Sequence, residues 1–196
     1  MNKVKSYSLL LLPVLAVSAF SSIAAVPETI TVDGGNINFT GSVVNAPCAV
    51  DVDHNGKSVM LGQVATNKLV SKGDTSSVVP FTIKLTGCDL AAEVAEEEEA
   101  VNYTKASITF NGSTIGDDST LALNTSGSGE NLAKNVGIQI LQNSKPIKID
   151  GSTATAAASL ISGNNEIPFG ATYVATADGA VAGTANSTVS FRVTYE

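Results

Sequence analysis

The sequence predicts an all-β protein, and three observations support this. Five segments alternate apolar and polar residues with a period of two, as in strands with one face on a core and the other in solvent. Clusters of turn-forming residues separate these segments. No long stretch has helical periodicity, and the composition is dominated by Gly, Ser, Thr, Asn, Val and Ala, which suits strands joined by tight turns.

The apolar positions define the five predicted strands. They are Val79, Phe81, Ile83 and Leu85; Ile108 and Phe110; Val136, Ile138 and Ile140; Ile167, Phe169, Ala171 and Tyr173; and Val189, Phe191, Val193 and Tyr195. Predicted turns lie at 53–56, 111–113, 126–129 and 178–179. Short antiparallel strands with Gly-rich turns favour a β-sandwich of immunoglobulin type. No linker or internal repeat interrupts the pattern, so we expect a single domain.

Residues 1–24 have the features of a secretory signal. Lys3 and Lys5 give a basic start, and the following apolar run from Leu9 to Phe20 has 12 residues, too few to span a bilayer as a helix. Small residues predict cleavage after Ala24, which would leave 172 residues with a formal charge of −9. The alternative, a retained membrane anchor, is disfavoured because the run is short and contains a proline.

Export determines how the two cysteines are interpreted. In an oxidising compartment, Cys48 and Cys88 are most simply one disulfide. Closing a loop of 40 residues stabilises the fold by roughly 4 kcal/mol in the chain-entropy model. The alternative, a redox-active pair, is disfavoured because the sequence has no C-x-x-C motif and no basic residue beside either cysteine.

Composition argues against several classes of function. A formal charge of −7 disfavours a nucleic-acid-binding protein, which needs a basic face for the phosphates. The single histidine, His54, lies in a polar turn, so neither a His-rich metal site nor a Ser-His-Asp triad is expected. The calcium-loop opening at 51–56 has Gly62 at its twelfth position, where the loop needs a glutamate. We therefore expect no enzyme, cofactor or metal, with a secreted enzyme on a sandwich scaffold as the disfavoured alternative.

One acidic segment, residues 91–100, departs from the strand pattern. It reads AAEVAEEEEA and is interpreted as a solvated loop or short helical turn on the surface. A cation site is the alternative, but four adjacent carboxylates cannot all point at one ion.

The two ends of the mature chain carry most of the functional information. In the N-terminal segment, Ile30 and Val32 share one phase of an extended chain, whereas Ile37 and Phe39 share the other, with Gly34-Gly35 between them. The C-terminal segment is an alternating strand with Tyr195 as the penultimate residue. Gly183 is the fourteenth residue counted back from the C-terminus.

Together these features resemble the major structural subunits of chaperone–usher pili, close to the type 1 fimbrial pilins. The matching motifs are FTGSVVNAPCAVD at 39–51, NVGIQIL at 135–141 and IPFGATY at 167–173, together with the signal, the glycine pair and the terminal strand. They spread over essentially the whole mature chain. The acidic segment after Cys88 is the departure from the family pattern.

The resemblance implies an incomplete immunoglobulin-like sandwich that lacks its last strand and is completed by donor-strand exchange. Residues 25–39 would be the donor-strand extension and residues 40–196 the pilin domain. The implied donor-strand residues are Ile30, Val32, Gly35, Ile37 and Phe39. The residues implied for the acceptor groove and chaperone contact are Gly183, Val189, Phe191, Val193 and Tyr195.

The resemblance also implies partners and a location. The partners would be identical subunits in a homopolymeric fibre, a periplasmic chaperone and an outer-membrane usher, and the chain would be exported through the periplasm to the surface fimbria. A minor adaptor or adhesive subunit of the same fimbria is the alternative. A tip adhesin would need a further lectin domain, for which 172 mature residues leave no room.

Overall fold

The structure is a computed structural model that describes residues 31–39, 41–51, 57–91, 102–124 and 131–196. The chain divides into two units, Met1–Phe39 and Thr40–Glu196, which are considered separately below as the extension and the body. The predicted signal, Ile30, His54 and the acidic residues 92–100 lie outside the described residues.

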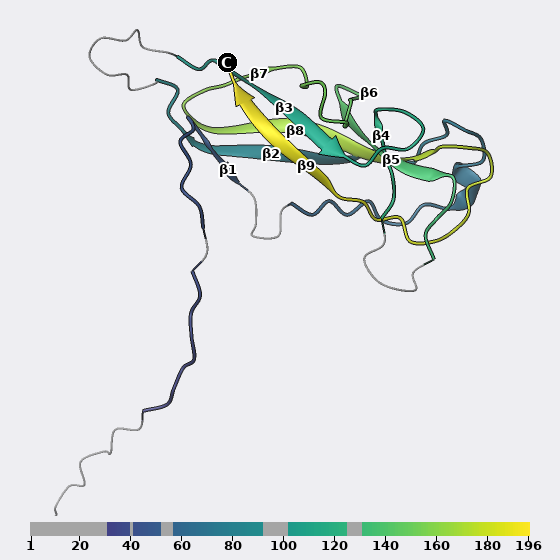
Figure 1. Cartoon of the computed structure of the whole chain (residues 1–196), viewed down its shortest axis with the longest axis horizontal. Helices are drawn as coiled ribbons and strands as arrows, with labels where there is room; N and C mark the ends of the chain where they lie inside the picture. Colours follow the sequence, from purple (N-terminus) through teal and green to yellow (C-terminus); the bar gives the residue numbers. More distant parts are fainter. Residues whose placement is uncertain (1–30, 40, 52–56, 92–101, 125–130) are drawn as a thin grey trace, which may run out of the picture. The chain divides into compact units, whose positions relative to one another are not determined.

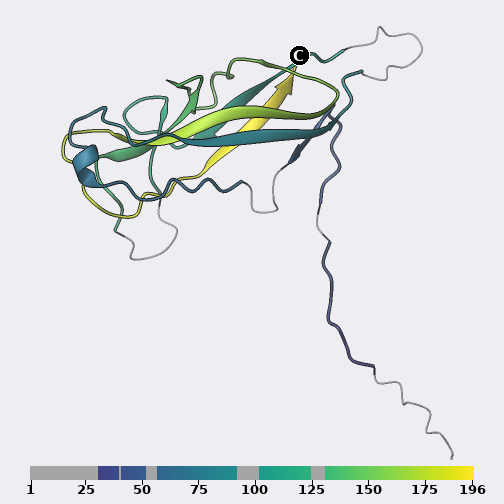
Figure 2. The same ribbon diagram turned by 180° about the vertical axis from the view of Figure 1, so that it is seen from behind.

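The larger sheet of the body contains six strands (Figure 1). Its main order is β1-β2-β8-β5-β4, with β6 paired to β5, and every pair is antiparallel. The bounds are β1 Ala49–Asp51, β2 Val79–Cys88, β4 Thr120–Leu121, β5 Val136–Gln142, β6 Lys145–Pro146 and β8 Gly163–Ala175. The long strands β2 and β8 lie side by side along the sheet, as both views show (Figures 1 and 2).

The smaller sheet has the order β7-β3-β9, again antiparallel. Its strands are β7 Ala158–Ser159, β3 Lys105–Gly112 and β9 Val189–Tyr195, so the C-terminal strand forms one edge of this sheet. The only helical element among the described residues is one 3-10 turn, η1 Thr66–Lys68. All five predicted strands are confirmed, as is the all-β fold class.

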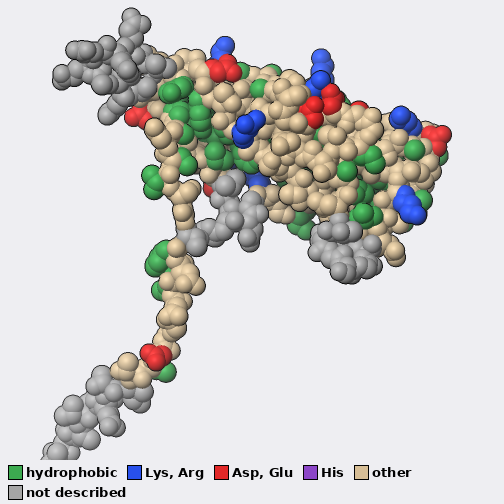
Figure 3. Space-filling model, viewed as in Figure 1, with side chains coloured by type: hydrophobic (Ala, Val, Ile, Leu, Met, Phe, Trp, Pro, Cys, Tyr) green, Lys and Arg blue, Asp and Glu red, His purple; other side chains and the backbone are tan. Residues whose placement is uncertain are grey.

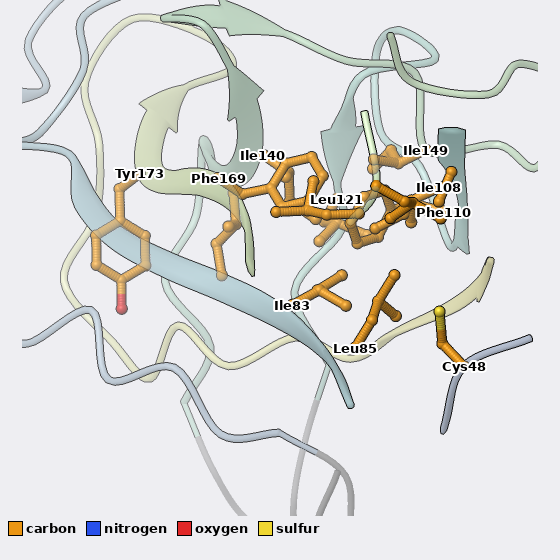
Figure 4. Packing of buried hydrophobic residues seen from close by; sticks show 14 of the residues in the cluster. Cys48, Ile83, Leu85, Ile108, Phe110, Leu121, Ile140, Ile149, Phe169 and Tyr173 are labelled. Carbon is orange, nitrogen blue, oxygen red and sulfur yellow. The ribbon is translucent and has the colours of Figure 1, made fainter. Parts of the chain in front are cut away.

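The core lies between the two sheets (Figure 4). Phe110 of β3 packs edge-to-face on Phe169 of β8, with ring centroids 5.3 Å apart. Ile108 and Leu85 are fully buried beside this pair. Inward-facing residues from both sheets therefore interdigitate, as in an immunoglobulin-like sandwich.

Strand β8 departs from the predicted alternation. From Phe169 to Ala175 both of its faces are buried. The reason is the segment before β2, which covers the outer face of β8: the Ser76 hydroxyl lies 3.0 Å from the Thr172 hydroxyl and accepts the N–H of Tyr173 at 3.1 Å. Burial of Thr172 is compatible with its polarity because the surrounding segment supplies hydrogen bonds.

The predicted turn at 111–113 is wrong in its first two residues. Asn111 and Gly112 belong to β3 and pair with Ser190 and Val189 of β9. A Cβ at Gly112 would overlap the end of the Leu121 side chain, which would have to shift to make room. The predicted turn at Asp178-Gly179 is present, with Gly179 in a left-handed conformation (φ +71°).

The predicted disulfide joins Cys48 to Cys88 and is confirmed. Cys88 ends β2, and Cys48 lies directly before β1, so the bond ties together two neighbouring strands of the larger sheet. Both cysteines are buried.

Removing this bond is expected to weaken the fold by about 4 kcal/mol, because the loop it closes has 40 residues. The Cys48→Ala/Cys88→Ala double variant should lower the midpoint temperature of thermal unfolding. A reducing agent should reproduce the drop in the natural chain and leave the variant unchanged. Equal unfolding temperatures for the variant and the natural chain would contradict the expected stabilisation.

Candidate functional site: an open groove along the C-terminal strand

An apolar groove of about 1300 Å³ runs along the body where a further strand of the smaller sheet would lie. Both sheets contribute its floor, so the groove opens directly onto the hydrophobic core. The floor residues are Phe81, Ile83, Phe110, Leu121, Ile138, Ile140, Ala171 and Tyr173. Apart from the partly buried Phe81, these floor residues are buried, so the groove reaches down to the core and its exposed apolar surface lies along its rims.

Strand β9 forms one rim of the groove. Its inward-facing residues, Val189, Phe191, Val193 and Tyr195, all line the groove and are only half-buried. On the paired strand β3, by contrast, Ile108 and Phe110 are almost completely buried. The same alternating pattern therefore gives less burial on β9, because no described strand pairs with its other edge.

The backbone of β9 is also open along this rim. Lys105 and Glu196 exchange both backbone hydrogen bonds, at 3.0 and 2.9 Å between nitrogen and oxygen. In two antiparallel strands, residue pairs that share backbone hydrogen bonds alternate with pairs that do not. The backbone hydrogen bonds to β3 therefore come from every second residue of β9, in the set that includes Thr194. The N–H and C=O groups that point outward to the groove belong to the other set: Val189, Phe191, Val193 and Tyr195.

Residues 57–62 form the opposite rim. Val59 and Leu61 are partly buried whereas Met60 is exposed, so this segment alternates like a strand. Among the described residues, however, its backbone makes no hydrogen bond to another backbone group and it joins no strand. The predicted strands do not include this rim, although the Val59-Met60-Leu61 alternation is a sequence signal for it.

Two tyrosines lie toward the two ends of the groove. At one end the Tyr195 hydroxyl donates to the Cys48 carbonyl oxygen at 3.3 Å, and its ring contacts Tyr103 edge-to-face. At the other end the Tyr173 hydroxyl donates to the Ala185 carbonyl oxygen at 3.3 Å. The Tyr195 contact joins β9 of the smaller sheet to the residue before β1 of the larger sheet, and the Tyr173 contact joins β8 to the segment that leads into β9.

The Tyr195 contact predicts a pH dependence. Burial raises the pKa of the Tyr195 phenol above its ordinary value, and it does the same to the pKa of Tyr173. Stability that depends on the neutral phenol is fully present below about pH 10 and is lost as pH rises through the raised pKa. Tyr195→Phe should therefore lower the free energy of unfolding by about 1 kcal/mol at neutral pH. It should also remove part of the loss of stability that the natural chain shows at alkaline pH.

Thermal unfolding temperatures measured between pH 8 and pH 11 check this expectation. The natural chain and the Tyr195→Phe variant should converge as the phenol ionises. A constant gap between the two over the whole range would contradict it.

Gly183 lies outside the groove lining and before β9. A Cβ at this position would overlap the backbone of Asn131, Leu132 and Ala133. Its close approach is fixed by neighbouring hydrogen bonds, such as the Thr184 N–H to the Asn131 carbonyl at 2.8 Å. The glycine therefore lets the segment leading to β9 pack tightly on its neighbour.

The described part of the extension is exposed. Val32, Ile37 and Phe39 expose 83%, 80% and 90% of their surface, and residues 31–39 form no strand. Gly35 has a left-handed conformation (φ +86°), which only glycine adopts without cost. The chain thus carries an exposed apolar alternating segment in addition to an open apolar groove.

In the part of the chain that the structure describes, no three His, Cys, Asp or Glu side chains come close enough to hold a metal ion. No helix in the described residues is long and apolar enough to span a membrane.

Comparison with known proteins gives consistent matches. Residues 37–196 match the family model described as fimbrial protein. The chain is 40% identical to fimbrial subunit type 1 of Klebsiella pneumoniae, over 99% of this chain and 100% of that protein. It is also 40% identical to the type-1 fimbrial protein A chain of Escherichia coli, with the same coverage.

A solved chaperone–usher pilus has the same fold as this chain. The TM-score is 0.64 at 23% identity, over 87% of this chain and 100% of the other. The chain therefore belongs to the fimbrial protein family and is a structural fimbrial subunit, exported and assembled at the cell surface.

Proposed function

We propose that this subunit polymerises head to tail, with residues 25–39 of one copy filling the groove of the next copy as its missing strand. The observation that carries the proposal is the match between two unfinished features of one chain. The groove has an apolar floor and a rim of unpaired backbone groups, and the extension supplies alternating apolar residues with no cover of their own. Addition of a strand to an open sheet edge satisfies both.

The free energy expected from donor-strand binding supports a durable fibre. Burial of Ile30, Val32, Ile37 and Phe39 is worth on the order of 10 kcal/mol before ordering costs, if the glycine pair lets both phases face the groove. Backbone hydrogen bonds to the outer edge of β9 add about 1 kcal/mol net each. The added strand completes the core, so dissociation resembles unfolding and is slow. The contact joins two different surfaces, the extension of one subunit and the groove of the next. Such a head-to-tail contact does not form a closed ring, so it propagates a filament.

Gly35 has a distinct role in this proposal. It shares its phase with Ile37 and Phe39, so all three would face the groove floor together. A residue without a Cβ lets the donor strand approach the floor closely at one point. We assign the close-approach position to Gly35 rather than Gly34 for this reason.

The same open edge makes the free subunit an aggregation hazard. We therefore propose that a periplasmic chaperone lends a strand beside β9 before assembly, and that an outer-membrane usher passes the subunit into the fibre. The chain acts as a structural component without catalysing a reaction. Its only co-assembling chain in the rod is a second copy of itself.

Deletion of residues 25–38 tests the proposal directly. The natural chain should run in detergent as a ladder of high-mass species that collapses to a monomer band only on boiling. The deletion variant should be exported but absent from that ladder, because the body has no donor strand to give. Persistence of the heat-sensitive ladder in the variant would refute strand exchange.

A further inference from the structure

A lysine is the one charged side chain among the described residues that line the groove. Lys57 is the first residue of the rim 57–62, and the other lining residues are apolar or uncharged. The rim starts on the side of β1 and continues toward η1, as Figure 1 shows. Of the rim residues, Lys57 therefore lies nearest to the groove end at which the Tyr195 hydroxyl contacts the Cys48 carbonyl.

Lys57 has no carboxylate partner within the described part of its own chain. The two ion pairs found there involve Lys84 and Lys148. Asp51, the last residue of β1, is aligned with Lys84 on β2. A strand that fills the groove removes water from the lysine ammonium, which is costly unless an anionic group takes the place of that water. The groove therefore favours a strand that brings an acidic residue to this position.

The extension supplies such a residue. Asp33 is the only charged residue in the described part of the extension, and its side chain is exposed. Figure 3 shows an acidic side chain on the extension among hydrophobic and uncharged ones. An isolated carboxylate inside an apolar donor strand is unfavourable unless the groove offers it a cation.

The phase of the donor strand turns Asp33 toward the groove. Asp33 lies two residues before Gly35 and therefore shares the phase of Gly35, Ile37 and Phe39. A strand that continues through the glycine pair without a change of phase places all four on the groove side. In that phase Val32 turns away from the groove floor.

The direction of the donor strand brings Asp33 to the end of the groove where Lys57 lies. All strand pairs in the smaller sheet are antiparallel, so the strand that completes it is expected to run antiparallel to β9. The segment from Asp33 to Phe39 has seven residues, as many as β9. With Phe39 beside Val189, Asp33 lies beside Tyr195. The flexible stem of the lysine lets its ammonium reach a carboxylate at this end.

We propose that Asp33 of one subunit forms an ion pair with Lys57 in the groove of the next subunit. This inference rests on the proposed strand exchange and adds the register at which the donor strand binds. A shift of one residue turns Asp33 to the other face of the strand and leaves both charges unpaired. The pair therefore selects one register, and it selects donor strands that carry an acidic residue at this position.

Charge reversal tests the ion pair in assembled fibres. Asp33→Lys and Lys57→Asp each bring like charges together, so each should reduce the heat-sensitive ladder at least fivefold. The double variant Asp33→Lys/Lys57→Asp restores opposite charges and should recover the ladder to within twofold of the natural chain. Lys145→Asp makes the same charge change as Lys57→Asp at an exposed residue of β6 and should leave the ladder within twofold. A double variant as defective as the single variants would overturn the inference.

Co-expression of the two single variants shows whether the pair joins different subunits. The Asp33→Lys subunit has a basic donor strand and a basic groove, whereas the Lys57→Asp subunit has an acidic donor strand and an acidic groove. Each donor strand then fits only the groove of the other variant, so the mixture should form an alternating fibre with a ladder within threefold of the natural one. A mixture as defective as either variant alone would overturn the inference.

Zero-length carbodiimide cross-linking of natural fibres, followed by mass spectrometry, detects the contact directly. We expect an amide bond between Lys57 and Asp33, and mixed isotope-labelled subunits should show that it joins two chains. Lys148 and Asp118, 2.8 Å apart within one subunit, serve as the positive control. A cross-link of Lys57 to Glu28 in place of Asp33, or a control cross-link without any bond at Lys57, would overturn the inference.

Failure of the ion pair and failure of strand exchange give different results. Natural ladders in both single variants would overturn the ion pair and leave strand exchange intact, as expected if the donor strand changes phase at the glycine pair. A heat-sensitive ladder that persists after deletion of residues 25–38 would refute strand exchange itself, and the ion pair with it.

Discussion

Replacing Ile37 with aspartate is expected to reduce the heat-sensitive fibre ladder at least 100-fold. The substitution removes about 2–3 kcal/mol of apolar burial from the proposed donor strand. It also places a carboxylate against an apolar groove floor, which costs several kcal/mol more when no partner is present. Since each 1.4 kcal/mol is a factor of ten, the combined loss exceeds two orders of magnitude in donor-strand affinity.

Asn38→Asp is the matched control, because it adds the same charge one residue along, in the opposite phase of the extended strand. It should leave the ladder within about threefold of the natural chain. Quantitative gels of surface-sheared material with and without boiling give both numbers. If the two variants assembled equally well, the phase that places Gly35, Ile37 and Phe39 in the groove would be wrong.

The strands could be predicted because most of them have one face on the core and the other in solvent. In β9 half-buried and exposed residues alternate with a period of two, as the sequence predicts. In β5 the alternating apolar residues Val136, Ile138 and Ile140 are buried, but Gly137 between them is buried as well. The disulfide could be predicted because an exported chain with only two cysteines has one simple pairing.

The exceptions occur where a distant segment changes a strand's environment. Residues around Ser76 cover the outer face of β8, so Thr172 is buried although its own neighbours in sequence indicate an exposed position. Asn111-Gly112 has the composition of a turn, but pairing with β9 holds it in β3. Such effects arise from tertiary contacts, which override local preference.

The groove itself could be anticipated only through a family resemblance. Alternation at 189–195 predicts a strand, and nothing local in those residues indicates that one of its edges stays open. The open edge follows from sheet order, because β9 pairs only with β3 among the described residues. Likewise, Gly183 is defined by its approach to the backbone at 131–133, a contact between segments about 50 residues apart.

A second large effect is expected for Phe191→Asp, at the middle of β9. Phe191 lines the groove and packs against Phe110, with ring centroids 6.1 Å apart. Any strand that binds along this rim, from a chaperone or from the next subunit, must bury the side chain at position 191. A charge there opposes both steps, so the subunit recovered from periplasmic extracts should fall at least tenfold.

Thr194→Asp is the matched control, since Thr194 is exposed on the opposite face of the same strand and gains the same charge. Its recovery should stay within about twofold of the natural chain. Quantitative immunoblots of periplasmic extracts measure both variants, and pull-down with the co-expressed chaperone reports the complex separately. Normal recovery and normal chaperone binding of Phe191→Asp would mean that the open rim of β9 is not where the helper strand binds. In that case the unpaired backbone of Val189, Phe191, Val193 and Tyr195 would need another cover, because an exposed edge over an apolar floor does not persist unprotected at cellular concentrations.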